Sequence, residues 1–208
     1  MATIGLIGSG HIGSTLARLA IDAGHDVVLS NSRGPDTLTG LVAELGEHAT
    51  AGTAEEAAQR GEIVVVTIPV RAIESVPVEP LAGKVVIDTN NYFPPRDGHI
   101  RALDSDETTS SELLAAHLPQ SKVVKAFNHI TAADLAEQGS PQGTPNRRAL
   151  AIAGEDVEAK QTVRELIDSF GYDVIDAGPL AQGRNYQPGT AAYGPRFDAE
   201  EMHRILRP

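Results

Sequence analysis

The chain has 208 residues, a net charge of −11 at pH 7, 4% aromatic residues and no cysteine. The charge argues against nucleic acid or an anionic membrane surface as partner, and the lack of cysteine excludes disulfides and thiolate metal sites and is typical of a cytoplasmic protein. No apolar stretch reaches the roughly 18 residues that a membrane-spanning helix needs, so we expect no membrane span. The sequence starts directly with a predicted strand, without a basic n-region or a cleavage site, so we expect no leader peptide.

The first 33 residues predict a strand–turn–helix–strand unit. Residues 3–7 form a short apolar run typical of a buried strand, and residues 8–13 read Gly-Ser-Gly-His-Ile-Gly. Apolar residues then recur at helical spacing as far as Gly24, and residues 27–29 form a second apolar run. A glycine motif between a strand and a helix is typical of dinucleotide-binding proteins, whereas the motif alone could be a turn without a ligand.

Each glycine of the motif has a separate role in such a site. Gly8 turns the chain sharply off the strand, Gly10 lets a diphosphate approach the backbone, and Gly13 lets the helix pack close to the strand. The N-terminus of the helix then presents free N–H groups to the phosphates. We expect His11 to lie near the diphosphate as a neutral side chain and not to act in catalysis.

The end of the second strand indicates which cofactor is bound. NAD sites usually carry an acidic residue there, about 20 residues past the motif, to hold the ribose 2′-hydroxyl. Here Asp26 lies at the opposite end of the strand, and the strand is followed by Asn-Ser-Arg. Arg33 can bind a 2′-phosphate, and Asn31 and Ser32 can donate hydrogen bonds to it, which predicts NADP(H). An ordinary surface arginine is the alternative interpretation of Arg33.

The rest of the chain alternates between predicted strands and helices. Strands are predicted at residues 49–51, 63–67, 84–88, 122–127, 150–154 and 174–175. Helices are predicted at residues 35–45, 53–60, 70–76, 109–117, from 131, around 163–170 and at 198–206, with an irregular surface excursion at 94–106. This alternation predicts an α/β fold with a doubly wound, mostly parallel Rossmann sheet whose first six strands have the order 3-2-1-4-5-6. We expect residues 1–208 to form a single NADP-binding domain, in which residues 148–208 are a C-terminal strand–helix–strand extension.

Several strand ends are expected to converge on one crevice. Residues 8–13, 67–69 and 128–130, with Asn90 nearby, follow predicted strands at their carboxyl ends, where open α/β sheets bind ligands. His129 could donate a proton to a substrate, although a single histidine at a strand end is more often structural. The histidines are scattered without the spacing of metal ligands, so we expect no metal site.

The motifs, taken in chain order, resemble those of the NADP oxidoreductases that depend on coenzyme F420. The matching segments are residues 5–13, 32–33, 66–69, 123–128 and 176–180, the last reading Asp-Ala-Gly-Pro-Leu. The resemblance extends over about residues 1–184. It implies hydride transfer between NADPH and a 5-deazaflavin ring, and a homodimer formed through the C-terminal part of the chain.

The resemblance also implies roles for single residues. Ser9 and residues 32–33 match positions that bind the NADP phosphates, residues 68–69 match the wall beside the nicotinamide, and Asn128 and Ile130 match positions that contact the deazaflavin. Together with the reasoning above, the expected cofactor-binding residues are Gly8, Ser9, Gly10, His11, Ile12, Gly13, Asn31, Ser32, Arg33, Thr67, Ile68, Pro69, Asn90, Asn128 and Ile130. Pro69 could equally be only the first-turn proline of the next helix.

Some positions depart from the family pattern. Asn128 stands where the family often has a histidine, and Thr37 stands where a basic residue can follow the Ser-Arg pair. The excursion after Tyr92 and the tail from residue 185 also differ from that pattern.

The sequence therefore leaves open two alternative functions in which NADPH is still the bound cofactor. One is direct reduction of a small imine or carbonyl compound, which predicts that His129 or Tyr92 matters as a proton donor. The other is a non-enzymatic NADPH-binding protein, which predicts affinity for the cofactor without turnover.

Overall fold

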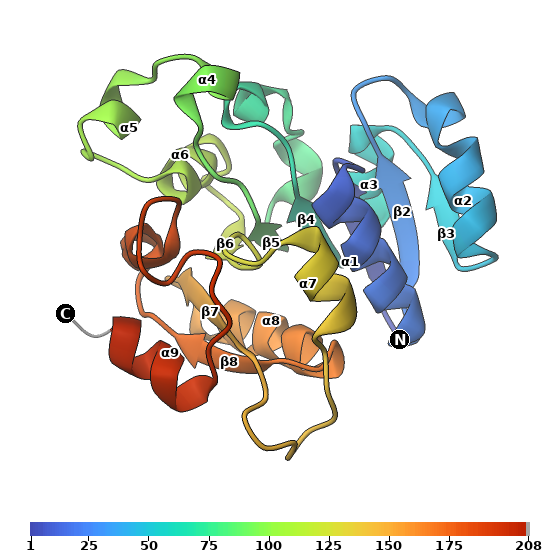
Figure 1. Ribbon diagram of the computed structural model, residues 1–208. Helices are drawn as coiled ribbons and strands as arrows, with labels where there is room; N and C mark the ends of the chain where they lie inside the picture. Colours follow the sequence, from blue (N-terminus) through green and yellow to red (C-terminus); the bar gives the residue numbers. More distant parts are fainter. Residues whose placement is uncertain (207–208) are drawn as a thin grey trace.

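The computed structural model describes residues 1–206, which contain one eight-stranded sheet flanked by helices (Figure 1). The spatial order of its strands is β3-β2-β1-β4-β5-β6-β7-β8, so the predicted order of the first six strands is confirmed. The strands are β1 (Thr3–Ile7), β2 (Asp26–Ser30), β3 (Ala49–Ala51), β4 (Ile63–Val66), β5 (Val85–Asp88), β6 (Lys122–Lys125), β7 (Ala149–Gly154) and β8 (Asp173–Asp176).

The direction of the strands changes once across the sheet. Strands β1 to β6 pair in parallel, whereas β7 pairs antiparallel to β6 through Val124 and Gly154. Strand β8 is parallel to β7. The two last strands therefore extend the same sheet, as predicted, but their carboxyl ends lie at the edge opposite to the carboxyl ends of β1 to β6.

Helices cover both faces because the central strands are apolar on both sides. Helices α1, α7 and α8 pack on one face through residues such as Leu16, Leu135 and Val163. Helices α3 and α6 pack on the other face through Ala57 and Leu114. The helical elements are α1 (His11–Asp22), α2 (Thr39–Leu45), α3 (Ala54–Arg60), α4 (Pro94–Asp97), α5 (Arg101–Asp104), α6 (Ser110–His117), α7 (Ala132–Glu137), α8 (Val157–Ser169), α9 (Ala199–Leu206) and the 3-10 turns η1 (Pro35–Leu38), η2 (Val70–Ser75), η3 (Glu79–Leu81) and η4 (Leu180–Tyr186).

Local sequence signals fix several helix starts. The side chains of Thr53 and Thr109 each accept a hydrogen bond from the backbone N–H three residues later. The side chains of Glu56 and Glu112 accept one from the backbone N–H of the same threonine, so each pair forms a capping box. Two predicted helices differ in detail. The helix expected at residues 35–45 begins with the 3-10 turn η1, and the one expected at 70–76 is the 3-10 turn η2 throughout, because it is short.

The C-terminal tail returns over the sheet. Turn η4 packs along β7, and the hydroxyl of Tyr186 donates a hydrogen bond to the Lys125 carbonyl at the end of β6. Helix α9 then packs on β7 and β8, with Met202 buried against Ala149 and Ala151. The apolar side of α9 is thus covered by its own sheet.

No helix between residues 1 and 206 combines the length and the apolar character needed to cross a membrane.

Candidate cofactor site

A cavity of about 460 Å³ lies over the point where β1, β2 and β4 end. From β1, the sheet continues to β2 and β3 on one side and to β4 on the other, and the cavity opens at this switch point. This is the usual position of a ligand in such sheets. The expected residues that line it are Gly8, Ser9, Gly10, Asn31, Ser32, Arg33, Thr67, Ile68 and Pro69. The lining residues that sequence reasoning did not single out are Ile7, Ser30, Ala54, Arg71, Ala72 and Ser75.

The glycines of the motif differ in what surrounds them. Gly8 has a φ of +112°, and a Cβ there would lie 2.1 Å from the Thr67 carbonyl oxygen. A Cβ on Gly13 would lie 2.3 Å from the Gly8 carbonyl oxygen, so both positions require glycine for the fold itself. A Cβ on Gly10 would meet nothing within 4 Å. The space above Gly10 is therefore free, as close approach of a diphosphate requires.

Helix α1 starts at this open position without a side-chain cap. Gly10 is its N-cap residue, and the first turn contains no acidic residue. The free N–H groups and the helix dipole therefore favour an anion at this point. Of the remaining motif residues, Gly13 lies beneath the turn, whereas His11 and Ile12 lie on α1 outside the cavity lining.

The loop after β2 is held by Asn31. Its Oδ1 accepts a 2.9 Å hydrogen bond from the Arg33 N–H, and its Nδ2 donates to Thr37 Oγ1 at 2.9 Å. Thr37, at the position where the family can carry a basic residue, thus braces this loop. Ser32 and Arg33 are exposed, and within residues 1–206 the Arg33 guanidinium has no acidic side chain within ion-pair distance. The loop presents a positive charge to the cavity while Asn31 mainly orients it.

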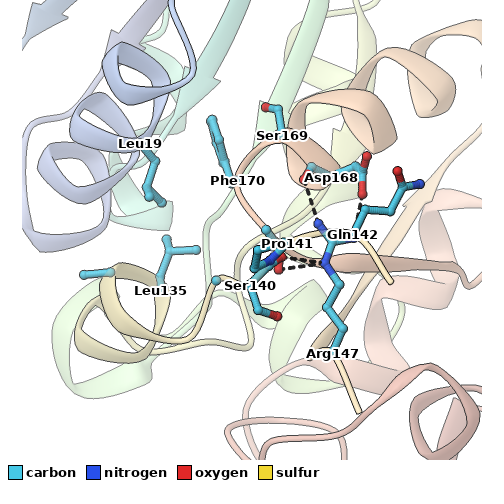
Figure 2. Close-up of a pocket in the computed structure, with 12 residues that line it drawn as sticks. Leu19, Leu135, Ser140, Pro141, Gln142, Arg147, Asp168, Ser169 and Phe170 are labelled. Atoms are coloured by element: carbon cyan, nitrogen blue, oxygen red, sulfur yellow. Dashed lines mark hydrogen bonds and ion pairs between the residues drawn. The ribbon is translucent and has the colours of Figure 1, made fainter. Parts of the chain in front are cut away.

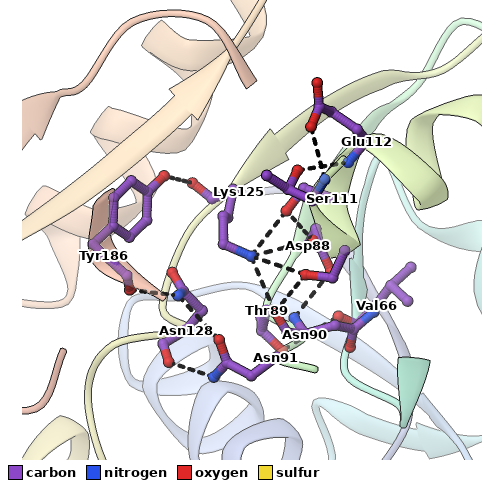
Figure 3. Close-up of polar contacts among 12 residues, drawn as sticks. Val66, Asp88, Thr89, Asn90, Asn91, Ser111, Glu112, Lys125, Asn128 and Tyr186 are labelled. Carbon is purple, nitrogen blue, oxygen red and sulfur yellow. Dashed lines mark hydrogen bonds and ion pairs between the residues drawn. The ribbon is translucent and has the colours of Figure 1, made fainter. Parts of the chain in front are cut away.

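The ends of β5 and β6 form a closed polar network that the sequence did not reveal (Figure 3). The Lys125 ammonium is fully buried and donates to Ser111 Oγ at 2.9 Å and to the Asn90 carbonyl at 3.1 Å. Asp88 lies 3.8 Å from that ammonium and accepts hydrogen bonds from Ser111 Oγ and the Asn90 N–H. Burial lowers the pKa of Lys125, and the Asp88 carboxylate opposes that shift. The sequence did contain one signal for this network. A lysine ends one apolar strand, and an aspartate ends the strand before it.

Asn90 joins this network to the cavity without lining it. Its Oδ1 accepts a 2.9 Å hydrogen bond from the Ile68 N–H, so the end of β5 fixes the segment after β4. Asn90 Nδ2 is buried without a hydrogen-bond partner among the described residues. Asn128 and Ile130 are also buried, and Asn128 Nδ2 donates to the Tyr186 carbonyl at 2.9 Å. The tail thus covers Asn128, Ile130 is buried in the core, and neither of these two positions expected to contact a deazaflavin lines the cavity.

The geometry of His129 contradicts its expected role as proton donor. The imidazole is 1% exposed, its Nε2 accepts a hydrogen bond from the Ala151 N–H, and its ring packs edge-on against Tyr186. Burial, with smaller contributions from Arg148 and Lys125, lowers the pKa of His129 to about 3. The neutral ring keeps its proton on Nδ1, which lies 3.5 Å from Asn128 Oδ1, and it is enclosed between β6, β7 and the tail without access to the cavity, so its role is structural.

A second cavity, of about 470 Å³, lies at the opposite edge of the sheet, where α1, α7 and α8 end (Figure 2). Arg147 is its most prominent polar group. The guanidinium pairs with Asp168 and Asp173 and donates to the carbonyls of Ser140 and Gly171. Its hydrogen-bonding groups are therefore engaged in holding the loop before β7. Within residues 1–206, no group of three or more histidine, aspartate or glutamate side chains is placed to hold a metal ion.

Comparison with known proteins supports this interpretation of the site. Residues 3–92 match the family described as NADP oxidoreductase, coenzyme F420-dependent. The crystal structure of a hypothetical protein from Sinorhizobium meliloti shares 31% identity over 95% of this chain and 96% of its own, with a TM-score of 0.82. A proposed F420-dependent NADP-reductase from Arthrobacter sp. FB24 shares 26% identity over 89% of this chain and 88% of its own, with a TM-score of 0.74.

The metalloreductases among the curated relatives are longer than this chain. Rat metalloreductase STEAP3 is 32% identical over 186 residues, which are 88% of this chain and 35% of that protein. The chain thus spans about a third of the length of the curated relatives it matches.

The fold and the cavity define the class: a Rossmann-type NADP-dependent oxidoreductase, with NADP(H) as its cofactor. Within that class, residues 3–92 place the chain in the family described as NADP oxidoreductase, coenzyme F420-dependent.

Proposed function

We propose that the chain transfers a hydride between NADP(H) and the deazaflavin coenzyme F420. The observation that carries this proposal is the open cavity over the glycine turn, where the uncapped start of α1 and the Arg33 guanidinium face the same space. NADPH supplies the hydride when it is bound, so the protein has to position and desolvate the two reacting rings. Family membership supports the deazaflavin as the acceptor.

The residues of the cavity have separate roles in this proposal. The backbone at Ser9 and Gly10 receives the diphosphate, and residues 32–33 bind the 2′-phosphate. Residues 67–69 form the wall beside the nicotinamide, and Asn90 holds that wall in place through the Ile68 N–H. Asn128 and Ile130 support the same end of the sheet from beneath the tail.

The lack of a presented acid favours a deazaflavin over direct reduction of an imine or carbonyl compound. Direct reduction usually needs a positioned proton donor. His129 is enclosed, and the Tyr92 hydroxyl is engaged with Asp104 at 2.7 Å and with the Ile100 N–H at 2.9 Å. Burial raises the pKa of Tyr92, and its hydrogen bond to Asp104 raises it further. Neither side chain is free to protonate a substrate in the cavity.

The test is to mix the purified protein with NADPH and oxidised coenzyme F420 and to follow the deazaflavin absorbance. We expect bleaching with NADPH and little with NADH, and an Arg33→Gln variant should lose this preference for NADPH. Tight NADPH binding without bleaching would overturn the deazaflavin as acceptor. Turnover of imines or carbonyls instead would then support a direct reductase, and no turnover with any acceptor would support a non-enzymatic NADPH-binding protein.

A homodimer in the cytoplasm is the assembly and location that we propose from the family resemblance and the cysteine-free sequence. Because α9 packs on its own sheet, another part of the C-terminal region would have to form the contact. Light scattering after size-exclusion chromatography tests the assembly, and a monomer at micromolar concentration would contradict it.

A further inference from the structure

Arg71 lines the cofactor cavity from the side opposite to Arg33. Arg33 follows β2 and Arg71 lies in η2, which follows β4, and these two strands flank β1 and its glycine turn. Sequence reasoning did not single out Arg71, because the matching segment at residues 66–69 ends two residues before it. The cavity is thus lined by one arginine from the β2 side and one from the β4 side.

Contacts with the excursion after β5 hold Arg71 in place. Its Nη1 donates a 2.9 Å hydrogen bond to the Arg96 carbonyl in α4, and its backbone N–H lies 3.5 Å from Asp97 Oδ1. Arg96 in turn donates to Asp97 through Nε and Nη2, at 3.1 and 2.8 Å, and to the Asn91 carbonyl at 2.6 Å. Helix α4 therefore connects the end of β5 to the start of η2. One N–H group of the Arg71 guanidinium fixes the position of the side chain through the Arg96 carbonyl, and the other N–H groups of the guanidinium remain available to a ligand.

The charge of Arg71 is not neutralised by a neighbour. Asp97, the nearest acid, is buried and forms its ion pair with Arg96. Burial alone would raise the pKa of Asp97, but the hydrogen bonds from Arg96 and Phe93 outweigh it and hold the pKa below its usual value. Within residues 1–206, Arg71 has no acidic side chain within ion-pair distance, although the chain carries a net charge of −11. Such a cation beside uncapped N–H groups fits a bound anion.

We propose that Arg71 binds the diphosphate of the dinucleotide, and that the excursion at residues 94–106 serves to position it. The assignment rests on the proposed NADP(H) site. Arg33, at the end of β2, is placed for the 2′-phosphate, whereas Arg71 lines the same cavity from the β4 side, where its contact with α4 anchors it. The two arginines thus have different targets: Arg33 selects NADPH over NADH, and Arg71 binds both.

The experiment compares Arg71→Gln with Arg33→Gln by calorimetric titration with NADPH, NADH and adenosine 2′-monophosphate, which lacks the diphosphate. Arg71→Gln should weaken the binding of NADPH and of NADH by a similar factor, roughly tenfold, because one charge-assisted contact with the ligand is lost. Its affinity for adenosine 2′-monophosphate should stay within about twofold of wild type. Arg33→Gln should show the opposite pattern, with weaker binding of NADPH and adenosine 2′-monophosphate and little change for NADH.

Two controls separate binding from general effects of charge and folding. Arg101→Gln removes the same charge from an exposed position on α5 that does not line the cavity, and it should leave all three affinities unchanged. Arg71→Lys keeps the charge and should recover part of the NADPH affinity. The positioning role predicts that Asp97→Asn weakens NADPH in the wild type but adds nothing in the Arg71→Gln background.

The outcomes distinguish this inference from the proposed function. If the NADPH affinity of Arg71→Gln equals that of Arg101→Gln, the assignment of Arg71 to the diphosphate is wrong while the cofactor site stands. The same holds if Arg71→Gln weakens the binding of only those ligands that carry a 2′-phosphate. If the wild-type protein binds neither dinucleotide, the proposed function fails together with it.

Discussion

The carboxyl edge of the sheet is open at one half and closed at the other. Over β1, β2 and β4 it carries a cavity, uncapped N–H groups and two guanidiniums without ion pairs in the described part of the chain. Over β5 and β6 the same edge is filled by the network of Lys125, Asp88 and Ser111, and the tail covers it. Both halves are polar, but only the first leaves its polar groups available.

This difference shows how polar residues that stabilise the fold can be distinguished from polar residues that bind a ligand. A buried polar group without a partner costs free energy, so polar residues that maintain the fold form hydrogen bonds with one another. A binding site must leave donors free until the ligand arrives. Residue type alone does not separate the two cases, because Lys125 and Arg33 are both basic residues at the carboxyl ends of strands in the same sheet. Their partners do.

The largest effect is expected from opening the closed half. Lys125→Met should lower the free energy of unfolding by about 3–5 kcal/mol, because it leaves the buried Asp88 carboxylate without its cation. Lys122→Met is a matched control on the same strand, since Lys122 is 38% exposed in its ion pair with Asp156, and it should cost less than about 1 kcal/mol. Urea unfolding measures both. Equal losses in the two variants would mean that the buried network does not contribute as proposed.

A smaller effect on stability is expected within the open half, where two glycines should respond differently. Gly8→Ala should lower the free energy of unfolding by about 2–3 kcal/mol, because of its positive φ and the clash with Thr67. Gly10→Ala should change stability by less than about 1 kcal/mol but weaken NADPH binding roughly tenfold, because its methyl group occupies the diphosphate space. Thermal unfolding and NADPH titration separate the two, and unchanged binding in Gly10→Ala would contradict the placement of the diphosphate.

The smallest effect concerns the pH dependence of the closed half. The pKa of His129 is about 3 in the folded state and near 6.5 in the unfolded chain, so the unfolded state takes up a proton first as the pH falls. The free energy of unfolding should therefore decrease from pH 6.5 towards pH 3, by about 2 kcal/mol between pH 7 and pH 5 from this residue alone. His129→Gln should remove that part of the slope, whereas His203→Gln, at an exposed position, should keep it. Urea unfolding at the two pH values provides the measurement.

Sequence reasoning predicted the open half far better than the closed half. The strand–turn–helix unit and the order of the first six strands follow from local apolar runs and the glycine motif, and residues 31–33 lie on the cavity as expected. The burial of His129 was not predictable in the same way. It depends on Tyr186 and Ala151, which are distant along the chain and reach it only through the tail and the antiparallel β7. Arg71 was missed because its position depends on the excursion, which has no periodic pattern.

The reversed direction of β7 has a consequence for the order in which the protein can fold during synthesis. All residues that line the open half have been made once β4 and η2 have emerged, because they come from the first 75 residues, and their supports at Asn90 and Arg96 follow about twenty residues later. The end of β6 must wait for η4 and the segment that follows, which are made about sixty residues later and return along β7. We therefore expect the nucleotide pocket to form early on the nascent chain and the buried Asn128 and His129 to stay exposed to solvent until the tail arrives.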